Sequence, residues 1–184
     1  GYVHISSMDD PSFRSVYADI LGKYNDREGI VIDTRFNGGG RLHEDIEILF
    51  SGKKYFTQVV RGREACDMPS RRWNKPSIMV TCEANYSNAH GTPWVYQHQG
   101  IGKVVGMPVP GTMTSVSWET LQDPTLYFGI PIVGYRLPDG SYLENKQLEP
   151  DVKIANSPEK IIKGEDEQLE IAVKELLKEI DSKK

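Results

Sequence analysis

The sequence predicts an α/β fold built on a mainly parallel sheet, and two observations support this prediction. Short apolar runs alternate with segments of helical spacing along the whole chain. The runs at residues 30–32 and 77–81 lack regular polar alternation, which is typical of strands buried on both faces of a parallel sheet. The 184 residues suffice for one domain that buries its own core without disulfides.

The first half of the chain is interpreted as alternating strands and helices followed by a charged loop. Residues 11–24 carry apolar side chains at helical spacing, and Asp10 before Pro11 is the expected N-cap. Residues 29–33 form an apolar run that ends in Asp33. The expected elements are strands at residues 2–5, 29–33 and 55–60, helices at 11–24 and 42–50, and a loop at 61–75.

The second half continues this pattern and ends in an amphipathic helix. The helix expected within residues 85–100 contains Gly91 and Pro93, which are expected to disturb its first half. From about Asp166 onward, one apolar stripe predicts the C-terminal helix. The other expected elements are strands at residues 77–81, 103–105 and 152–154, an extended segment at 125–136 and a turn at 138–140.

The composition excludes several classes of protein. The chain has 22 Lys and Arg against 26 Asp and Glu, a formal net charge of −4, so no basic face for a nucleic acid is expected. No apolar run approaches the roughly 18 residues of a membrane span. Cys66 and Cys82 are too few for a disulfide framework and lack the spacing of a zinc site. We therefore expect a globular protein without a nucleic-acid partner, membrane span, metal or cofactor.

Two loops leave the carboxyl ends of predicted strands, where functional residues of parallel sheets gather. They are residues 34–41 and 82–87. The first contains Asn37 followed by three glycines, whose backbone N–H groups can turn toward an anion. Neither the GxxxxGK motif of phosphate loops nor the GxGxxG motif of dinucleotide sites is present. A backbone donor for a developing oxyanion remains as the chemical interpretation, beside the alternative of a flexible turn.

The second loop ends at Ser87, directly before the next expected helix. Because a helix N-terminus favours nearby negative charge, Ser87 is a candidate nucleophile, and the N–H of Asn88 is a candidate second oxyanion donor. Alternatively, Ser87 only caps the helix, since serine is a preferred N-cap residue. The GxSxG motif of the α/β-hydrolases is absent.

A serine nucleophile needs a base, and the chain offers no convincing candidate. His90 lies three residues after Ser87, a spacing too short for a working dyad. Glu144 could orient a histidine or a serine hydroxyl, or it could be an ordinary exposed acid. The histidines of the chain are His4, His43, His90 and His98.

In their order and spacing, these segments resemble the tricorn and tail-specific (C-terminal processing) family of serine peptidases. The most specific segment is GIVIDTRFNGGG at residues 29–40, which is similar to the strand and glycine loop of the family. TCEANYS at residues 81–87 looks like its nucleophile turn. The likeness continues in GYVHI at residues 1–5, GKVVG at 102–106, Glu144 with Asn145, EPDV at 149–152 and the terminal helix.

The resemblance implies a role for several residues and a more specific fold. It implies Ser87 as the nucleophile and Glu144 as the acidic residue that orients the catalytic network. It implies the backbone N–H groups of Gly40, in preference to Gly39, and of Asn88 as the oxyanion donors, with Gly39 beside the substrate. The implied fold is the layered ββα core shared with ClpP and the crotonases.

The resemblance also implies what the protein acts on and works with. In the tricorn branch an acid can read a basic P1 side chain, and Gln58 falls at that place by its spacing from Gly40. Because Gln58 is uncharged, we expect no trypsin-like preference. The expected partners are a peptide or protein substrate, upstream segments of the same protein and further copies in a homo-oligomer. The expected compartment is the cytoplasm or the bacterial periplasm.

The base departs from the family pattern. In the tail-specific branch a lysine after the nucleophile is the base, but Thr112 stands at that place with no lysine nearby, so we expect no Ser–Lys dyad. In the tricorn branch the base is a histidine on a segment that precedes an inserted PDZ domain, and this segment is absent from residues 1–184. Residues 1–184 are therefore expected to be the C-terminal part of a peptidase core domain, inactive alone because the base lies upstream.

Three alternatives stay open at this point. The same scaffold could be a non-catalytic module that binds peptides or apolar ligands, which a distorted helix after Ser87 would favour. Acyl-CoA chemistry of the crotonase kind could use the paired N–H groups, although Ser87 on its turn and Glu144 speak against it. Cys82 or Cys66 could be a nucleophile, but Cys82 lies at the end of a buried strand and is better interpreted as a core residue.

Overall fold

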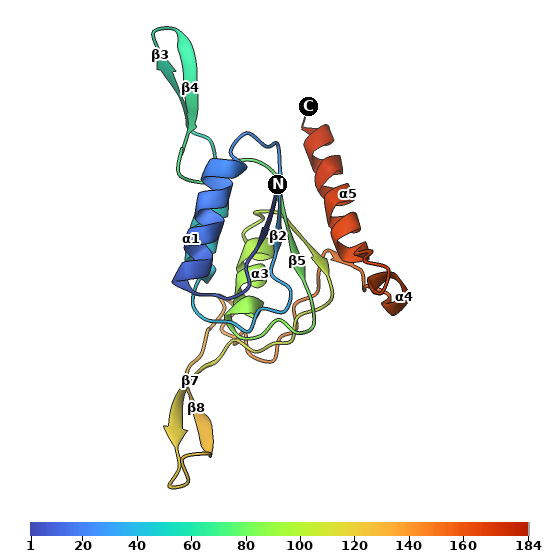
Figure 1. Ribbon diagram of the computed structural model, residues 1–184. Helices are drawn as coiled ribbons and strands as arrows, with labels where there is room; N and C mark the ends of the chain where they lie inside the picture. Colours follow the sequence, from blue (N-terminus) through green and yellow to red (C-terminus); the bar gives the residue numbers. More distant parts are fainter. Residues whose placement is uncertain (184) are drawn as a thin grey trace.

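The computed structural model describes residues 1–183 and is organised around one parallel sheet (Figure 1). Its strands lie in the order β1-β2-β5-β6-β9, and every neighbouring pair is parallel. The predicted α/β fold with a parallel sheet is confirmed. The strands are β1 (Tyr2–His4), β2 (Ile30–Asp33), β5 (Ser77–Thr81), β6 (Lys103–Gly106) and β9 (Val152–Lys153).

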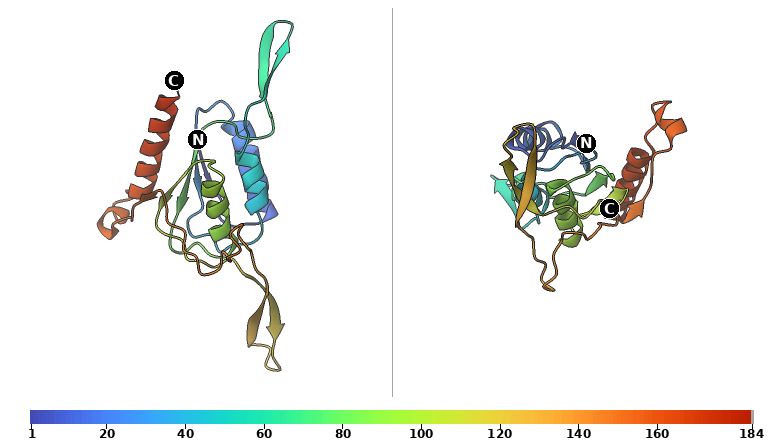
Figure 2. Two further views of the ribbon diagram at one scale, coloured as in Figure 1. Left: turned by 180° about the vertical axis from the view of Figure 1, so that it is seen from behind. Right: turned by 90° about the horizontal axis from the view of Figure 1, so that it is seen from below.

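Helices cover both faces of the sheet, which explains why the central strands are apolar throughout (Figure 2). In β2, the side chains of Ile30 and Ile32 pack with the cluster beneath α1, α2 and α3, whereas Val31 packs against α5 on the other face. The helices are α1 (Asp10–Ala18), α2 (His43–Phe50) and α3 (Asn88–His98) on one face, with α5 (Glu167–Ser182) on the other and the short α4 (Pro158–Ile161) before it.

The first helix begins one residue earlier than predicted. Asp9, not Asp10, is the N-cap, because its backbone is extended and its carboxylate accepts a hydrogen bond from Ser12 N at 2.9 Å. Asp10 instead forms an exposed ion pair with Arg14 at 2.6 Å. The predicted helix 11–24 continues from α1 through a π-helical turn at Asp19–Lys23.

Two β-hairpins project from opposite ends of the sheet (Figure 1). The first pairs β3 (Phe56–Val60) with β4 (Arg63–Met68), so the prediction of a loop over residues 61–75 is wrong. The chain reverses because Arg61 and Gly62 both adopt positive φ, at 50° and 80°. The second hairpin pairs β7 (Ser115–Thr120), which the sequence did not indicate, with β8 (Tyr127–Val133).

Helix α3 runs without a break through Gly91 and Pro93, contrary to the expected disturbance. Pro93 cannot donate to the carbonyl of Ala89, but Asn85 Nδ2 donates to that oxygen at 3.3 Å. At Gly91 a Cβ would lie 2.5 Å from Met113 Sδ, so glycine allows Met113 to pack against the helix. The helix therefore starts directly after Ser87 and is regular there.

Among the described residues, no helix is both long and apolar enough to cross a membrane. Nor do residues 1–183 contain a cluster of three or more His, Cys, Asp or Glu side chains arranged to hold a metal ion.

Candidate active site

Ser87 stands on a strained turn between β5 and α3. Its φ and ψ are 55° and −123°, a backbone conformation that a non-glycine residue adopts only when its surroundings hold it there. Two long-range bonds hold the turn: Ser87 N donates to Thr112 Oγ1 at 3.1 Å, and Tyr86 N donates to Asn37 O at 3.0 Å. The hydroxyl of Ser87 does not cap α3 and has no hydrogen bond within residues 1–183.

The glycine loop lies directly against Ser87. Gly39 has φ +99°, and a Cβ there would lie 2.6 Å from Ser87 Cβ and 2.8 Å from Tyr86 O. Gly40 has φ +135°, and a Cβ there would lie 2.1 Å from Met8 O. Both positions therefore require glycine, one for the approach to Ser87 and the other for the approach to the chain after β1.

The N–H groups of the two predicted oxyanion donors differ from that of Gly39. Gly39 N donates to Asn37 Oδ1 at 2.8 Å and so cannot serve a ligand. The N–H groups of Gly40 and Asn88 donate to no acceptor within residues 1–183. A Cβ on Gly39 would lie 3.2 Å from Asn88 N, which places the glycine loop beside the start of α3. Of these two glycines, only Gly40 keeps an N–H without an acceptor within residues 1–183.

Asn37 joins the parts of the site, a role that sequence reasoning missed. Its fully buried side chain donates from Nδ2 to Ile5 O at 2.7 Å and accepts from Gly39 N through Oδ1. Its carbonyl accepts from Tyr86 N, next to Ser87. Asn37 therefore links the end of β1, the glycine loop and the nucleophile turn. Its position directly before three glycines was the available signal.

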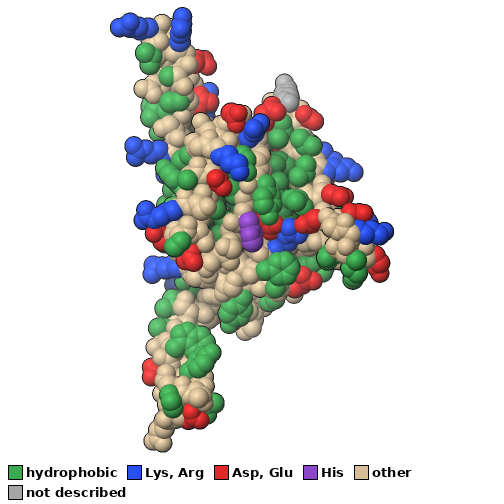
Figure 3. Space-filling model, viewed as in Figure 1, with side chains coloured by type: hydrophobic (Ala, Val, Ile, Leu, Met, Phe, Trp, Pro, Cys, Tyr) green, Lys and Arg blue, Asp and Glu red, His purple; other side chains and the backbone are tan. Residues whose placement is uncertain are grey.

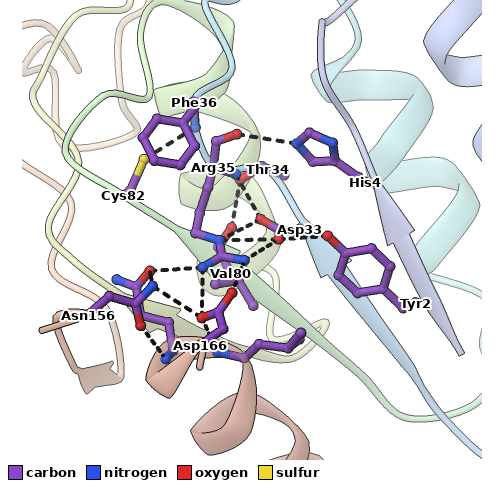
Figure 4. A network of polar contacts seen from close by, with 12 residues as sticks. Tyr2, His4, Asp33, Thr34, Arg35, Phe36, Val80, Cys82, Asn156 and Asp166 are labelled. Carbon is purple, nitrogen blue, oxygen red and sulfur yellow. Dashed lines mark hydrogen bonds and ion pairs between the residues drawn. The ribbon is translucent and has the colours of Figure 1, made fainter. Parts of the chain in front are cut away.

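A buried ion cluster anchors the residues before the glycine loop to α5 (Figure 4). Arg35, 9% exposed, bonds to Asp33 at 2.6 Å, Asp166 at 2.8 Å and Gln168 at 3.1 Å. Burial opposes the charge of Arg35, but its bonds with the two carboxylates raise its pKa. The hydroxyl of Tyr2 donates to Asp33 at 2.9 Å. Burial, and to a smaller extent the negative charge of Asp33, raises the pKa of Tyr2 to about 12. The cluster fixes the end of β2 against the N-terminus of α5.

The structure brings Glu144 near the site but not into contact with Ser87. Glu144 Oε2 accepts a hydrogen bond from Thr114 N at 2.7 Å, two residues after Thr112. Thr112 stands where the tail-specific branch has its base lysine, and its hydroxyl oxygen accepts the hydrogen bond from Ser87 N. Glu144 is thus linked to the nucleophile turn through one short segment of chain.

Gln58 is not brought to Ser87 by the fold of this chain. It lies on the β3–β4 hairpin, which projects from the end of the sheet where the strands begin, whereas Ser87 follows the end of β5 (Figure 1). Its Oε1 accepts from Cys66 Sγ at 3.2 Å. Cys66 is exposed and lies on the same hairpin as Gln58. Cys82 is buried, and its Sγ accepts a hydrogen bond from Phe36 N at 3.2 Å and donates to Asn85 Oδ1 at 3.4 Å.

No histidine side chain forms a hydrogen bond with Ser87 within residues 1–183. The backbone N–H of His90 donates to the carbonyl of Ser87 at 2.8 Å, which is a bond of the first turn of α3. His90 is fully buried, and both ring nitrogens lack a hydrogen-bond partner in this part of the chain. Burial lowers the pKa of His90 against smaller opposing effects of Lys146 and Glu144. The others have their own contacts: His4 with Arg35 O, His43 with Asn88, and His98 stacked on Trp94.

A cavity of about 250 Å³ lies along α3, from Gly91 to the C-terminal end of the helix at His98. Its lining is mainly apolar and aromatic. It also contains the guanidinium of Arg136 and the imidazoles of His43 and His98. Of the α3 residues that line the cavity, Gly91 is the nearest to Ser87 in the sequence, four residues after it. The apolar and aromatic lining is formed by Trp94, Val95, Met113, Tyr135, Leu137, Pro138 and Leu143.

Comparison with known proteins gives a consistent family. Residues 1–154 match the profile of Peptidase family S41. The tricorn protease of Thermoplasma acidophilum is 24% identical over 181 residues, which cover 98% of this chain and 17% of that protein. Tricorn protease homolog 1 of Streptomyces coelicolor is 27% identical over 178 residues, 94% of this chain and 16% of that protein. The chain spans about a sixth of the length of these relatives.

Solved structures share the fold. The crystal structure of the tricorn protease matches with a TM-score of 0.85 at 23% identity, over 98% of this chain and 18% of that one. The photosystem II D1 C-terminal processing protease matches with a TM-score of 0.63 at 16% identity, over 84% of this chain and 42% of that one. The layered α/β core expected from the sequence is therefore confirmed.

Proposed function

Since residues 1–154 match its profile, the chain belongs to peptidase family S41, and we propose that it carries the nucleophile and the oxyanion hole of a serine peptidase. One observation carries this proposal: Ser87 stands on a strained turn against Gly39 with its hydroxyl uncommitted in the described chain. Strain of this kind, about 1–3 kcal/mol, persists where the surrounding structure holds a functional residue in place. If the serine only capped α3, its side-chain oxygen would accept a hydrogen bond from a backbone N–H in the first turn of the helix.

In the proposed reaction, the Ser87 hydroxyl attacks a peptide carbonyl while its proton passes to a base. The carbonyl oxygen becomes an oxyanion that accepts hydrogen bonds from the N–H groups of Gly40 and Asn88. Each such donor contributes about 2.7–4 kcal/mol to transition-state stabilisation. The base returns the proton to the leaving amine, and water then hydrolyses the acyl-enzyme.

The base is proposed to be a histidine on a segment upstream of residue 1, in a protein that also carries a PDZ domain. The support is that no imidazole within residues 1–183 bonds to Ser87, and that the Ser87 hydroxyl does not cap α3. Glu144 would orient the base, since its segment is bonded to the segment that holds Ser87. The chain alone is therefore expected to hydrolyse peptides very slowly, because removing a base costs orders of magnitude in rate.

The proposed substrate is a peptide whose P1 side chain is uncharged. The cavity beside α3 is mainly apolar, has no acidic side chain and contains Arg136, so it suits an apolar or aromatic group and repels a basic one. These features together support the expectation that the peptidase is not trypsin-like.

A homo-oligomer is proposed from the two hairpins. Both expose apolar side chains, and isolated two-stranded hairpins are at best marginally stable in water (Figure 3). Residues 53–75 hold seven Lys and Arg against two Asp and Glu, and the rest of the chain holds 15 against 24. The excess of positive charge lies in the residues that flank the β3–β4 hairpin, and it favours contact between the base of that hairpin in one copy and the acidic body of another. Sedimentation of the chain tests this, and a monomer at all concentrations would contradict it.

The catalytic proposal is tested by hydrolysis of an unfolded protein with a longer form that includes the upstream residues. Ser87→Ala is expected to abolish hydrolysis, and Ser182→Ala, on α5, is expected to leave it unchanged. If Ser87→Ala keeps full hydrolysis, the proposal is wrong. If neither form hydrolyses anything yet both bind peptides equally, the chain is a binding module, although the distorted helix that suggested this alternative is not found.

A further inference from the structure

His43 contacts the residue that follows the nucleophile. His43 is the first residue of α2, and Asn88 is the first residue of α3. Although the two are 45 residues apart, Asn88 Nδ2 and His43 Nδ1 lie 2.8 Å from each other. Asn88 is 2% exposed and the imidazole is half-buried, so the contact belongs to the interior of the site.

The orientation of the Asn88 amide is fixed by its other bonds. Asn88 Oδ1 accepts from Leu42 N at 2.8 Å and from His43 N at 3.1 Å. Both partners are backbone donors at the start of α2, so the oxygen must face them and the amide cannot be flipped. The group that faces the imidazole is therefore the NH₂, which is a donor only.

This orientation determines the protonation state of His43. Because Asn88 Nδ2 donates, His43 Nδ1 must accept, and the proton of the neutral ring is on Nε2. A protonated imidazole carries N–H groups on both nitrogens, so Nδ1 would then face Asn88 as a second donor. The contact can exist only while His43 is neutral.

The surroundings of His43 favour the neutral ring. Burial is the largest cause and lowers the pKa of His43. The charge of Glu44 opposes it, Arg41 lowers the pKa further, and Asp45 has the smallest, raising effect. The start of a helix also disfavours a positive charge. From the other elements, the ring meets the edge of Tyr135 at 6.0 Å between centroids and shares a cavity with His98 and Arg136.

We propose that His43 is a positioning residue: its neutral, Nε2-protonated ring holds Asn88 in place, and protonation releases Asn88 together with one of the two oxyanion donors. This inference rests on the proposed function of the Asn88 N–H. Asn88 has three side-chain bonds, all to Leu42 and His43, and a charged ring replaces one of them by a donor–donor contact. The Asn88 side chain must then turn, and its backbone N–H follows.

The test is an NMR titration of the 184-residue chain between about pH 5 and about pH 8, the range in which histidines titrate. The imidazole nitrogens of His43 are expected to show the Nε2–H tautomer, with a midpoint below the ordinary value of about 6.5. The backbone amide of Asn88 is expected to move with the same midpoint. In His43→Gln, whose side-chain oxygen can still accept from Asn88, this amide is expected to stay constant with pH.

His98→Gln is the matched control, because it removes another histidine of the same cavity without touching Asn88. It is expected to leave the titration of the Asn88 amide unchanged. An Nδ1–H tautomer for His43, or an Asn88 amide that does not follow the ring, would overturn the proposal. Dispersed amide spectra show that the variants fold. If His43→Ala does not fold, His43→Gln still tests the proposal, because its side-chain oxygen can accept from Asn88.

Activity provides a second readout in a longer, hydrolytically active form of the protein. His43→Ala is expected to lower kcat by about tenfold, less than the loss of an oxyanion donor, with little change in KM, and His43→Gln is expected to recover most of it. Wild-type kcat is expected to fall toward acid with the midpoint of the Asn88 amide. If Ser87→Ala leaves hydrolysis intact, the proposed function fails. If Ser87 is essential but Asn88 is independent of His43, only this inference fails.

Discussion

Replacing Gly39 by alanine tests the geometry of the site most severely, because the added methyl group points at the nucleophile. Its Cβ would lie 2.6 Å from Ser87 Cβ and 2.8 Å from Tyr86 O, both closer than real Cβ contacts. The φ of +99° is also a conformation that favours glycine. Either the glycine loop or the turn that carries Ser87 must move.

The magnitude follows from these two effects. Holding a non-glycine residue at such a φ costs roughly 1–3 kcal/mol. Since the atoms in the way are a Cβ and a backbone oxygen, a side-chain rotation cannot relieve the clash, and overpacking of this kind adds about 1–3 kcal/mol. With partial relaxation, we expect Gly39→Ala to lower the free energy of unfolding by about 2–4 kcal/mol.

Urea denaturation of the chain measures this change, and Gly38→Ala is the matched control. A Cβ on Gly38 meets nothing within 4 Å, so this variant is expected to be neutral or slightly stabilising. In Gly39→Ala the backbone amide of Asn88 is also expected to shift, because a Cβ on Gly39 would lie 3.2 Å from its nitrogen. If Gly39→Ala is as stable as Gly38→Ala, the placement of the glycine loop against Ser87 is wrong.

Three further changes probe the supports of the site. Arg35→Ala leaves two carboxylates without their buried partner and is expected to lower the free energy of unfolding by about 3–5 kcal/mol. The control Arg14→Ala, at an exposed ion pair, is expected to change it by less than about 0.5 kcal/mol, and equal effects of the two variants in urea denaturation would contradict the cluster. Thr112→Val removes the acceptor of Ser87 N and is expected to cost about 1 kcal/mol; unchanged stability would contradict this bond. Burial lowers the pKa of His90 in the folded state, so below the unfolded value of about 6.5 the unfolded state binds more protons than the folded state. The wild type is therefore expected to lose stability relative to His90→Leu as the pH falls to about 5, and parallel pH profiles of the two proteins would contradict this.

Most of the sheet could be predicted from the sequence because its strands are buried on both faces. Ile30 to Ile32 and the run at Ser77–Thr81 leave no polar alternation, and short runs of this kind are typical of central parallel strands. In the β3–β4 hairpin, residues 55–60 predicted β3, but β4 gave no signal. Its side chains are largely exposed, so no apolar face marks β4, and only the turn at Arg61 and Gly62 sets it.

The candidate site could be predicted in part. The positions of Ser87 and of the glycines after buried strands could be read from the sequence, and in the structure the two loops follow β5 and β2 as predicted. The supports could not be predicted, because they depend on contacts between distant segments. Thr112 meets Ser87 across 25 residues and His43 meets Asn88 across 45, and no local pattern in the sequence encodes either pair.

The most direct test of the central claim is labelling of the chain by a fluorophosphonate, with the labelled residue identified by mass spectrometry. If Ser87 is a nucleophile without its base, labelling is expected to be slow, confined to Ser87 and proportional to the hydroxide concentration, because hydroxide then removes the proton. Adding the upstream residues is expected to raise the rate near neutral pH by orders of magnitude. Label on another residue, or labelling that survives in Ser87→Ala, would contradict the account.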